Sequence, residues 1–313
     1  MSLTVVGSIA FDTVSTPFGS RERMLGGSAV HFALAASFFT DVRVVGPVGD
    51  DFGEQQLALL RGRGVATEDI ERVPGGSTFF WRGHYDYDLN TAHTDETQLG
   101  VFGEFEPKLS AASRECDVLF LANIQPSLQR EVREQCAQAR FVALDSMNLW
   151  IDTAKDELLE TIGLVDCLLL NDAELRMLTG KPSLAQAARE LLDRGPRAVI
   201  AKRGEYGAAL FTTEGFFALP AFPLETVVDP TGAGDSFAGG LLGAIAAARE
   251  EGTELDHEGL KRAMAYGTAL ASFNVEELGT DRVARLSAEE ISRRVEELRE
   301  ITRMPEDPVS LRS

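Results

Sequence analysis

Short apolar runs alternate with amphipathic segments along most of the chain. The apolar runs are continuous rather than alternating, which is typical of strands covered on both faces of a sheet; they lie at 3–9, 42–48, 117–124, 140–145, 165–171 and 198–202. Helical periodicity recurs at 54–62, 127–138, 153–162, 172–179, 183–194, 257–276 and 287–303. Repeated strand-then-helix units predict an α/β fold in which helices flank a mostly parallel central sheet on both faces.

A second pattern covers residues 77–88, where aromatic and polar or charged side chains alternate. One face carries the aromatic residues Phe79, Trp81, Tyr85 and Tyr87, and the other carries Arg82, His84, Asp86 and Asp88. Such alternation indicates a strand with one side in water, and residues 91–101 are predicted to return as its partner. The hairpin is either a small β-sheet lid over a site or an ordinary edge hairpin.

The predicted organisation is a single α/β domain over residues 1–313. A lid is inserted from about 10–20 and 76–103, a hairpin is expected over 207–219, and residues 304–313 are expected to form a flexible tail. Hydrophobic residues make up 44% of the chain, and no apolar run approaches the roughly 20 residues of a membrane span. No segment resembles a signal peptide, so a cytoplasmic location is expected.

The net charge of −19 argues against nucleic acid or an anionic membrane as a partner, because both require a basic face. The three cysteines, Cys116, Cys136 and Cys167, are far apart and lie in apolar patterns. They are therefore predicted to be buried thiols rather than metal ligands or a disulfide framework.

The chemically richest stretch is 229–243, Asp-Pro-Thr-Gly-Ala-Gly-Asp-Ser-Phe-Ala-Gly-Gly-Leu-Leu-Gly, which follows a strand-like run at 226–228. Gly232, Ala233 and Gly234 offer backbone N–H groups at the start of a predicted helix over 236–249, where an anion is favoured. Asp235 then places a carboxylate beside this anion hole. A helix cap would explain Asp235, but it would not explain Gly-Ala-Gly or the glycines 239, 240 and 243 inside the helix.

Four further groups are predicted to lie at strand ends of the same sheet. They are Asp12, the pair Gly26-Gly27, the pair Asn171 and Glu174, and the turn from Lys202 through Gly204 to Gly207. Three of them have simpler alternatives: a surface turn for Asp12, a helix cap for Asn171 with Glu174, and a charged turn for 202–207. Because the carboxyl ends of parallel strands share one edge, however, all of them are expected to converge with 232–235 on a single site.

Two common nucleotide-binding patterns are absent. The dinucleotide pattern G-x-G-x-x-G would need glycine at Phe237, and the P-loop pattern would need Ser or Thr after Gly180-Lys181, where the chain has Pro182. An anion hole beside a carboxylate, with an amide and a carboxylate suited to hydrated Mg²⁺, indicates phosphoryl transfer without a P-loop. In this scheme Asp235 orients or deprotonates the attacking hydroxyl.

The run 229–235 resembles the C-terminal signature of the ribokinase-like (PfkB) carbohydrate kinases, D-[TP]-T-G-A-G-D. Further similarity lies in Asp12, Gly26-Gly27, the segment 48–53, the N-x-x-E of Asn171 and Glu174, and the turn 202–207. The resemblance implies ATP- and Mg²⁺-dependent phosphorylation of a small sugar, with Asp235 as base and Gly232–Gly234 as anion hole.

The resemblance also implies roles for other residues. Substrate-binding residues would be Asp12, Gly26, Gly27 and His31; nucleotide-binding residues would be Asn171, Lys202, Gly204, Gly207 and Asn274. Glu174 and Asn171 would hold Mg²⁺ through water, and many relatives use K⁺, which here would lie beside Asp229 and Thr231. A homodimer formed through the lid is a further expectation from the relatives.

Three departures from the family pattern bear on the substrate. His31 stands where the family commonly has Asn, Ala10 where ribose-specific members have Asn, and Ser28 where they have Lys. These differences weaken a ribose assignment. A sugar kinase is the first prediction, a nucleoside kinase the alternative, and a ligand-binding protein without catalysis the second alternative; the aromatic lid face could cover either a sugar ring or a nucleobase.

Overall fold

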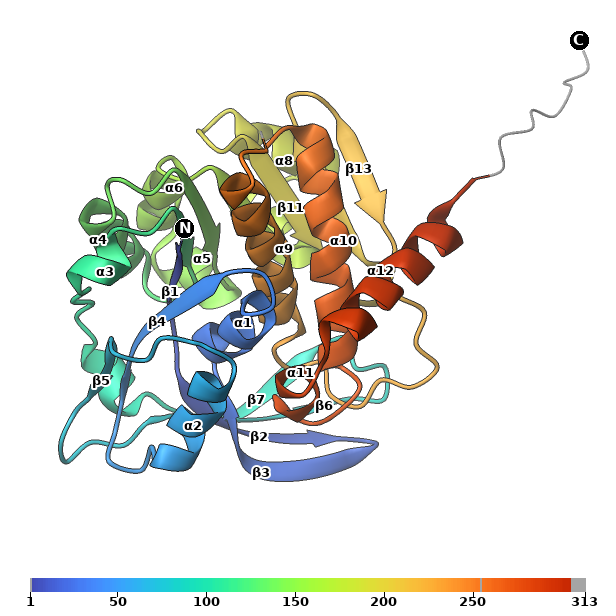
Figure 1. Ribbon diagram of the computed structural model, residues 1–313. Coiled ribbons are helices and arrows are strands. Elements are labelled where there is room, and N and C mark those ends of the chain that lie inside the picture. Colours follow the sequence, from blue (N-terminus) through green and yellow to red (C-terminus); the bar gives the residue numbers. More distant parts are fainter. Residues whose placement is uncertain (1, 254, 305–313) are drawn as a thin grey trace, which may run out of the picture.

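A nine-stranded sheet forms the centre of the protein (Figure 1). The structure is a computed structural model, and it describes residues 2–253 and 255–304. The strand order is β13-β12-β11-β10-β9-β8-β1-β4-β5. The strands are β1 (Ser2–Val6), β4 (Asp41–Val48), β5 (Ile70–Arg72), β8 (Val118–Leu121), β9 (Phe141–Asp145), β10 (Cys167–Asn171), β11 (Ala198–Lys202), β12 (Ala208–Thr212) and β13 (Phe216–Leu219).

Strands β11 to β5 in this order run parallel, while β12 and β13 add an antiparallel edge. The register aligns the ends of neighbouring strands, so that Asn171 of β10 lies opposite Lys202 of β11. Strand β9 ends next to them at Asp145. Three polar side chains are thus brought to one edge of an otherwise apolar sheet.

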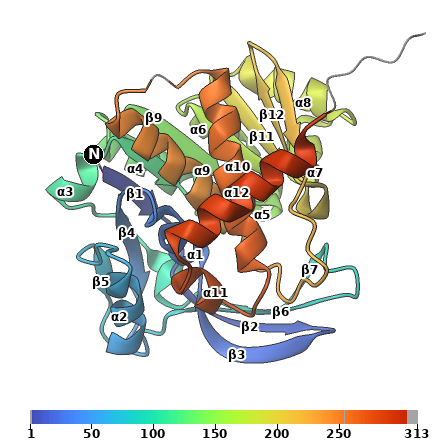
Figure 2. The ribbon, with the colours of Figure 1, turned by 45° about the vertical axis from the view of Figure 1, so that its right-hand side comes forward.

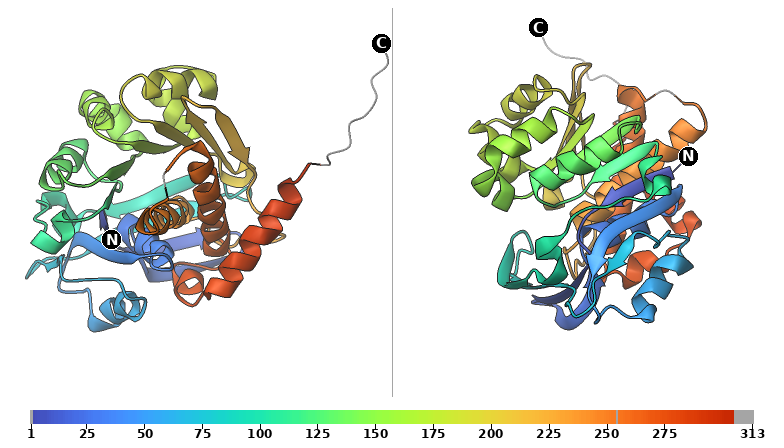
Figure 3. Two further views of the ribbon diagram at one scale, coloured as in Figure 1. Left: turned by 45° about the horizontal axis from the view of Figure 1, so that its top comes forward. Right: turned by 90° about the vertical axis from the view of Figure 1, so that its left-hand side faces the viewer.

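Helices cover both faces of the sheet (Figures 2 and 3). One face is covered by α1 (Ser28–Ala36), α9 (Ala233–Glu250) and α10 (His257–Asn274), with α2 (Glu54–Gly62) and α11 (Asp281–Ala284) on the same side and α12 (Ala288–Thr302) packed on α10. The other packs against α4 (Pro126–Gln135), α5 (Asn148–Thr153), α6 (Lys155–Ile162), α7 (Asp172–Thr179) and α8 (Leu184–Leu192), with α3 (Ala111–Arg114) and the 3-10 turn η1 (Gly100–Glu104) nearby. This confirms the predicted fold class.

The small second sheet has the order β3-β2-β6-β7. Its strands are β2 (Ala10–Thr16), β3 (Gly19–Gly26), β6 (Phe79–Tyr85) and β7 (Ala92–Gln98). The first lid segment therefore reaches Gly26 rather than ending near residue 20. Strand β1 also ends at Val6, which places Asp12 in the lid and not at the end of a core strand as the sequence analysis expected.

Two other expectations differ from the structure. Residues 226–228 form no strand; the Val228 N–H donates to the Val275 carbonyl at the end of α10, because the sheet already ends at β13. Glycines 239, 240 and 243 serve helix packing rather than an anion site. A Cβ at Gly239 would come within 2.4 Å of the Phe32 carbonyl oxygen, and one at Gly240 within 2.7 Å of the Tyr266 carbonyl oxygen.

The three cysteines are buried free thiols, as predicted. No helix of the described segments combines the length and the apolar character that crossing a membrane requires. The expected flexible tail lies, apart from Met304, outside the described residues.

Candidate active site

Asp235 lies in the first turn of α9, directly after a left-handed turn at Gly232, whose φ is 75°. Burial, and after it the carboxylate of Asp145, raise the pKa of the Asp235 carboxyl to about 7, although the ammonium of Lys202 opposes both. A carboxyl group that titrates near neutral pH is suited to accept a proton from an alcohol.

The loop before Asp235 presents backbone donors. The Ala233 N–H donates to the Pro230 carbonyl at 3.2 Å and is therefore engaged. The N–H groups of Gly232 and Gly234, by contrast, have no protein acceptor within residues 2–253 and 255–304. Two free donors at the N-terminus of an 18-residue helix suit an anion. The anion hole therefore has two N–H donors, whereas the sequence predicts three.

Lys202 joins the strand edge to this loop. Its ammonium group donates to Asp145 Oδ2 at 2.5 Å, and its side chain is 19% exposed against 6% for Asp145. A Cβ at Gly234 would lie 3.3 Å from Lys202 Nζ, so the ammonium is next to the anion hole. Burial lowers the pKa of Lys202, but the carboxylates of Asp145 and Glu174 outweigh it and the pKa is raised overall. Lys202 is therefore a cation at neutral pH.

Asn171 and Glu174 form a reciprocal cap at the start of α7. The Asn171 N–H donates to Glu174 Oε2 at 2.7 Å, and the Glu174 N–H donates to Asn171 Oδ1 at 2.8 Å. The helix-cap alternative from the sequence is therefore correct for this pair. Burial nevertheless raises the pKa of Glu174 to about 7, with Lys202 opposing it and Asp145 adding to it.

Asp12 approaches the same site from the lid. Its carboxyl group accepts the Gly27 N–H; burial raises its pKa to about 7, and Asp229 and Asp235 add to the increase. A Cβ at Gly26 would lie 1.9 Å from Asp12 Oδ2, which explains why glycine is required there. The effect of Asp235 on the pKa of Asp12 indicates that the two carboxyl groups belong to one site, although 223 positions separate them.

The aromatic face of the lid is turned toward this site. Trp81 lies beside Asp12 in the register of β2 and β6 and so shares its face. The Tyr85 hydroxyl is 3.1 Å from Thr231 Oγ1, in the loop that precedes Asp235. Burial raises the pKa of Tyr85 to about 12. Tyr87, predicted on the same face, lies past the end of β6 and is 81% exposed.

His31 and Asn274 are placed differently from the sequence expectation, because both are buried beneath the loop. His31 is 3% exposed and its Nδ1 lies 3.0 Å from Asn274 Oδ1, while Asn274 is fully buried. Burial lowers the pKa of His31. In the structure neither side chain is open to a substrate or a nucleotide; both instead contact the segment 231–236.

Asp229 is also fully buried. Its Oδ1 accepts the Thr231 N–H at 2.9 Å and its Oδ2 accepts the Gly279 N–H at 3.1 Å. The carboxylate thus ties the loop to the segment after α10.

The turn after β11 carries the remaining predicted residues. Gly204 begins the short 3-10 helix η2 (Gly204–Tyr206), and both Gly204 and Gly207 have positive φ, 54° and 84°. Asn90, in the turn between β6 and β7, donates from Nδ2 to Glu205 Oε1 at 3.5 Å. The lid therefore reaches the turn that was predicted to bind the nucleotide.

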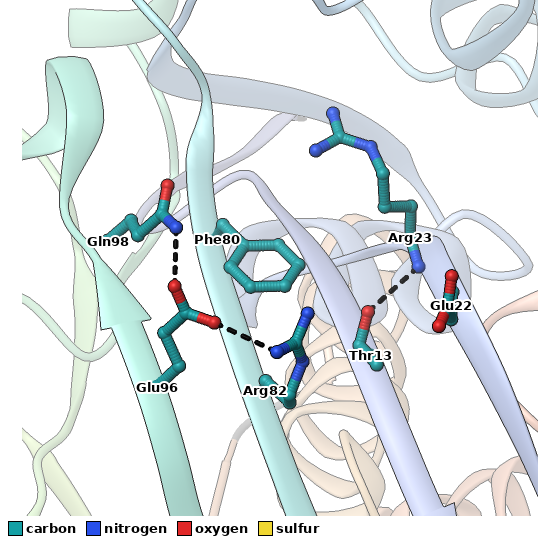
Figure 4. Close-up of a pocket in the computed structure, with 7 residues that line it drawn as sticks. All are labelled: Thr13, Glu22, Arg23, Phe80, Arg82, Glu96 and Gln98. Atoms are coloured by element: carbon teal, nitrogen blue, oxygen red, sulfur yellow. Dashed lines mark hydrogen bonds and ion pairs between the residues drawn. The ribbon is translucent and has the colours of Figure 1, made fainter.

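A pocket of about 240 Å³ lies on the other face of the lid (Figure 4). It is lined by Thr13, Glu22, Arg23, Phe80, Arg82, Glu96 and Gln98. Its two arginines already have partners, since Arg82 pairs with Glu96 and Arg23 with Asp51. Strand alternation directs Thr13 and Arg82 away from Asp12 and Trp81, so this pocket is separate from the site around Asp235.

Asp145 is the site residue that the sequence analysis missed. It ends the fully buried strand β9, and its carboxylate holds Lys202 and raises the pKa of both Asp235 and Glu174. The sequence did contain an indication of this role. Asp145 is an acidic residue at the end of an apolar strand, and Asn171 and Lys202 end their strands at the same edge of the sheet.

Comparison with known proteins finds a family model and several relatives. The model of the pfkB family carbohydrate kinases matches residues 3–285. A cytidine kinase of Thermococcus kodakarensis is 28% identical over 271 residues, covering 84% of this chain and 95% of the relative. A deoxyribokinase of Salmonella typhi is 39% identical over 229 residues, covering 68% and 72%.

A solved structure shares the fold. It is a putative ribokinase II of E. coli in complex with ATP and Mg²⁺, with a TM-score of 0.75 and 20% identity; the match covers 95% of this chain and 99% of that chain. Because the family model spans nearly the whole chain, this protein belongs to the pfkB family of carbohydrate kinases, phosphotransferases that act on an alcohol group.

Proposed function

We propose that the protein transfers the γ-phosphoryl group of ATP to a hydroxyl group of a nucleoside, with Asp235 as the base. The observation that carries the proposal is the Asp235 carboxyl group, with a pKa raised to about 7, at a helix start with two free N–H groups. Trp81, on the same lid face as Asp12, supports the choice of a nucleoside.

In this mechanism Asp235 accepts the proton of the attacking hydroxyl group as the new oxygen–phosphorus bond forms and the bond from the γ-phosphorus to the bridging oxygen breaks, so that ADP leaves with that oxygen. The Gly232 and Gly234 N–H groups donate to the phosphoryl oxygens, where charge develops in the transition state. Lys202, next to Gly234, adds a positive charge to the same point. Asp12 orients the acceptor through its hydroxyl groups; Gly26 leaves room for that carboxylate, and the Gly27 N–H donates to it.

The residues around Glu174 fit a magnesium ion. Glu174 is a half-buried carboxyl group whose pKa is raised to about 7, and Asp145 adds a second carboxylate nearby. Of the two Glu174 oxygens, Oε2 accepts the Asn171 N–H, and Oε1 has no hydrogen bond within the described chain. Carboxylate oxygens are the ligands that Mg²⁺ prefers, directly or through water. When bound, the ion would neutralise charge on the nucleotide phosphates.

A potassium ion beside Asp229 and Thr231 is part of the proposal. Both Asp229 oxygens already accept one N–H group, yet each carboxylate oxygen retains a further acceptor site. Activity in KCl is expected to exceed activity in NaCl at the same ionic strength, and equal rates would remove K⁺ from the proposal.

The aromatic side chains of the lid favour a nucleoside over a free sugar. Trp81 is half-buried, and its indole N–H donates to Thr94 Oγ1 at 3.1 Å, which fixes the ring. Gly83 allows the ring to lie against the strand, since a Cβ there would come within 2.3 Å of the indole. A fixed aromatic ring beside a hydroxyl-binding carboxylate matches a ligand that has both a base and a sugar.

A free sugar is the second candidate, and the 39% identity to a deoxyribokinase favours it. An ADP-release assay with matched pairs, cytidine or inosine against ribose and deoxyribose, separates the two. Turnover with nucleosides alone supports the proposal, whereas turnover with free sugars alone replaces it with a sugar kinase. Binding of ATP and a nucleoside by calorimetry without any ADP release would indicate the non-catalytic alternative.

A homodimer formed through the lid is also proposed. Phe18, in the turn between β2 and β3, is 51% exposed, and Tyr87, after β6, is 81% exposed; their rings lie 6.2 Å apart. Two exposed aromatic rings at one lid tip support an interface. Sedimentation of the double variant Phe18→Ser, Tyr87→Ser is expected to give a monomer where the native protein gives a dimer; a native monomer would contradict the proposal.

A further inference from the structure

The Asn274 side chain makes three hydrogen bonds, all of them to the elements around the anion hole. Its Nδ2 donates to the Thr231 carbonyl at 2.7 Å. Its Oδ1 lies 3.0 Å from Ser236 Oγ, which donates to it, and 3.0 Å from His31 Nδ1. The amide orientation follows from chemistry, because the Thr231 carbonyl can only accept and therefore must face the NH₂ group.

Thr231 and Ser236 bracket the segment that carries the proposed chemistry. Between them lie the free N–H groups of Gly232 and Gly234 and the Asp235 carboxyl group. The start of α9 has no side-chain cap, since its N-cap residue is Gly232. One buried amide from the end of α10 therefore joins both ends of this segment.

His31 supports the same arrangement from α1. Its imidazole ring packs directly against Gly232, where a Cβ would lie 2.3 Å from Nδ1. With Nδ1 protonated, the ring donates to Asn274 Oδ1 while it blocks movement of the loop at its left-handed residue. Three helices thus meet at one fully buried amide group.

We propose that Asn274 and His31 are positioning residues that hold Gly232, Gly234 and Asp235 in the geometry required for phosphoryl transfer. This inference rests on the proposed function of that segment. It assigns to Asn274 a role other than direct contact with the nucleotide, because the side chain is 0% exposed and each polar atom already has a partner. It assigns His31 a role other than acceptor binding.

The main test is Asn274→Leu, which keeps the size of the side chain and removes all three hydrogen bonds. A shift of about 1 Å in a reacting group can cost on the order of 10²-fold in rate, so kcat is expected to fall by roughly that factor. The KM for ATP is expected to stay within about threefold. Amide hydrogen exchange in the peptide 229–238 is expected to become faster.

Thr268→Val is the matched control. Thr268 lies in the same helix, is 5% exposed, and its hydroxyl group has no partner within the described part of the chain. This variant is expected to leave kcat, KM and exchange at 229–238 unchanged. If Asn274→Leu is insoluble, His31→Leu decides, since it removes one of the three hydrogen bonds; a five- to tenfold lower kcat is then expected, about 1 to 1.4 kcal/mol.

Two results would overturn the inference. An ATP KM at least tenfold higher with kcat unchanged would make Asn274 a direct nucleotide contact. A folded Asn274→Leu variant with native kcat and native exchange would show that the amide positions nothing. Failure of the proposed function is distinguishable: the native protein would then release no ADP with any acceptor, while the exchange measurement would still report whether Asn274 holds the loop.

Discussion

Replacing Gly232 with alanine tests how closely the loop before Asp235 is packed, because the structure separates two costs. The first is conformational: φ is 75° at Gly232, and a residue with a Cβ in the left-handed region costs about 1–2 kcal/mol. The second is steric: the new Cβ would lie 2.3 Å from His31 Nδ1, and overpacking of a buried site costs about 1–3 kcal/mol. The free energy of unfolding is therefore expected to fall by about 2–5 kcal/mol.

Gly180→Ala is the control that isolates the first cost. Gly180 ends α7 with φ 68° and ψ 13°, close to the 75° and 1° of Gly232, and nothing lies within 4 Å of its Cβ position. This variant is expected to lose only about 1–2 kcal/mol. Both losses are measured by urea unfolding followed by circular dichroism.

The double variant Gly232→Ala, His31→Ala completes the test. Without the imidazole ring the steric cost disappears, so the two changes should be less destabilising together than the sum of their separate effects, by roughly 1–3 kcal/mol. Equal losses for Gly232→Ala and Gly180→Ala, together with additive behaviour in the double variant, would refute the close contact between His31 and the loop.

Four further predictions concern the charges and the lid. The pKa of Asp235 is raised to about 7 by burial and Asp145, so kcat/KM should rise with pH and level off above about 7, and a flat profile from pH 5 to 8 would contradict the role of base. For the same reason this group contributes stability below its unfolded pKa that is lost as pH rises through about 7, measurable as a lower urea midpoint at pH 8 than at pH 5. Asp145→Asn removes one charge that raises this pKa, so the acid limb of the rate profile should move to lower pH; an unmoved limb would show that Asp145 does not influence the base. Tyr85→Phe removes the hydrogen bond to Thr231, worth about 0.5–1.5 kcal/mol, so the KM for the acceptor should rise roughly 2- to 10-fold; an unchanged KM would show that this contact between the lid and the loop does not support acceptor binding.

Much of the fold could be predicted from hydrophobic patterning alone. Strand β11 and helices α2 and α7 have the predicted bounds, because each is a regular apolar or amphipathic segment with clear breaks on either side. The segment 226–228 misled the prediction. Its β-branched residues favour a strand, but strand formation needs a neighbour to pair with, and sequence does not show that the sheet has already ended at β13.

The glycines of α9 illustrate a second limit. In the sequence, Gly239, Gly240 and Gly243 favour an anion site, but in the structure they lie where α9 crosses α1 and α10, and the Phe39 ring would meet a Cβ at Gly243 at 2.6 Å. Glycine permits close backbone approach to a helix as readily as to a ligand. Only the packing of the three helices distinguishes the two causes.

The residues of the candidate site also differ in how far the sequence alone could predict them. Asp235, Asp12 and Lys202 could be predicted because each follows or precedes a clear local pattern. The role of Asn274 could not, because its three partners come from residues 31, 231 and 236, which are distant in sequence or belong to another element. Asp145 was overlooked since a single acidic residue at a strand end is common, and its importance arises from Lys202, 57 positions later.

The most direct measurement is the turnover of Asp235→Asn beside the native protein, with ATP and the best acceptor from the nucleoside and sugar panel. Asparagine keeps the size of the side chain and cannot accept the proton, so kcat is expected to fall by on the order of 10² to 10⁴. Calorimetry should give an unchanged affinity for ATP. Native turnover in this variant would contradict the assignment of Asp235 as the base.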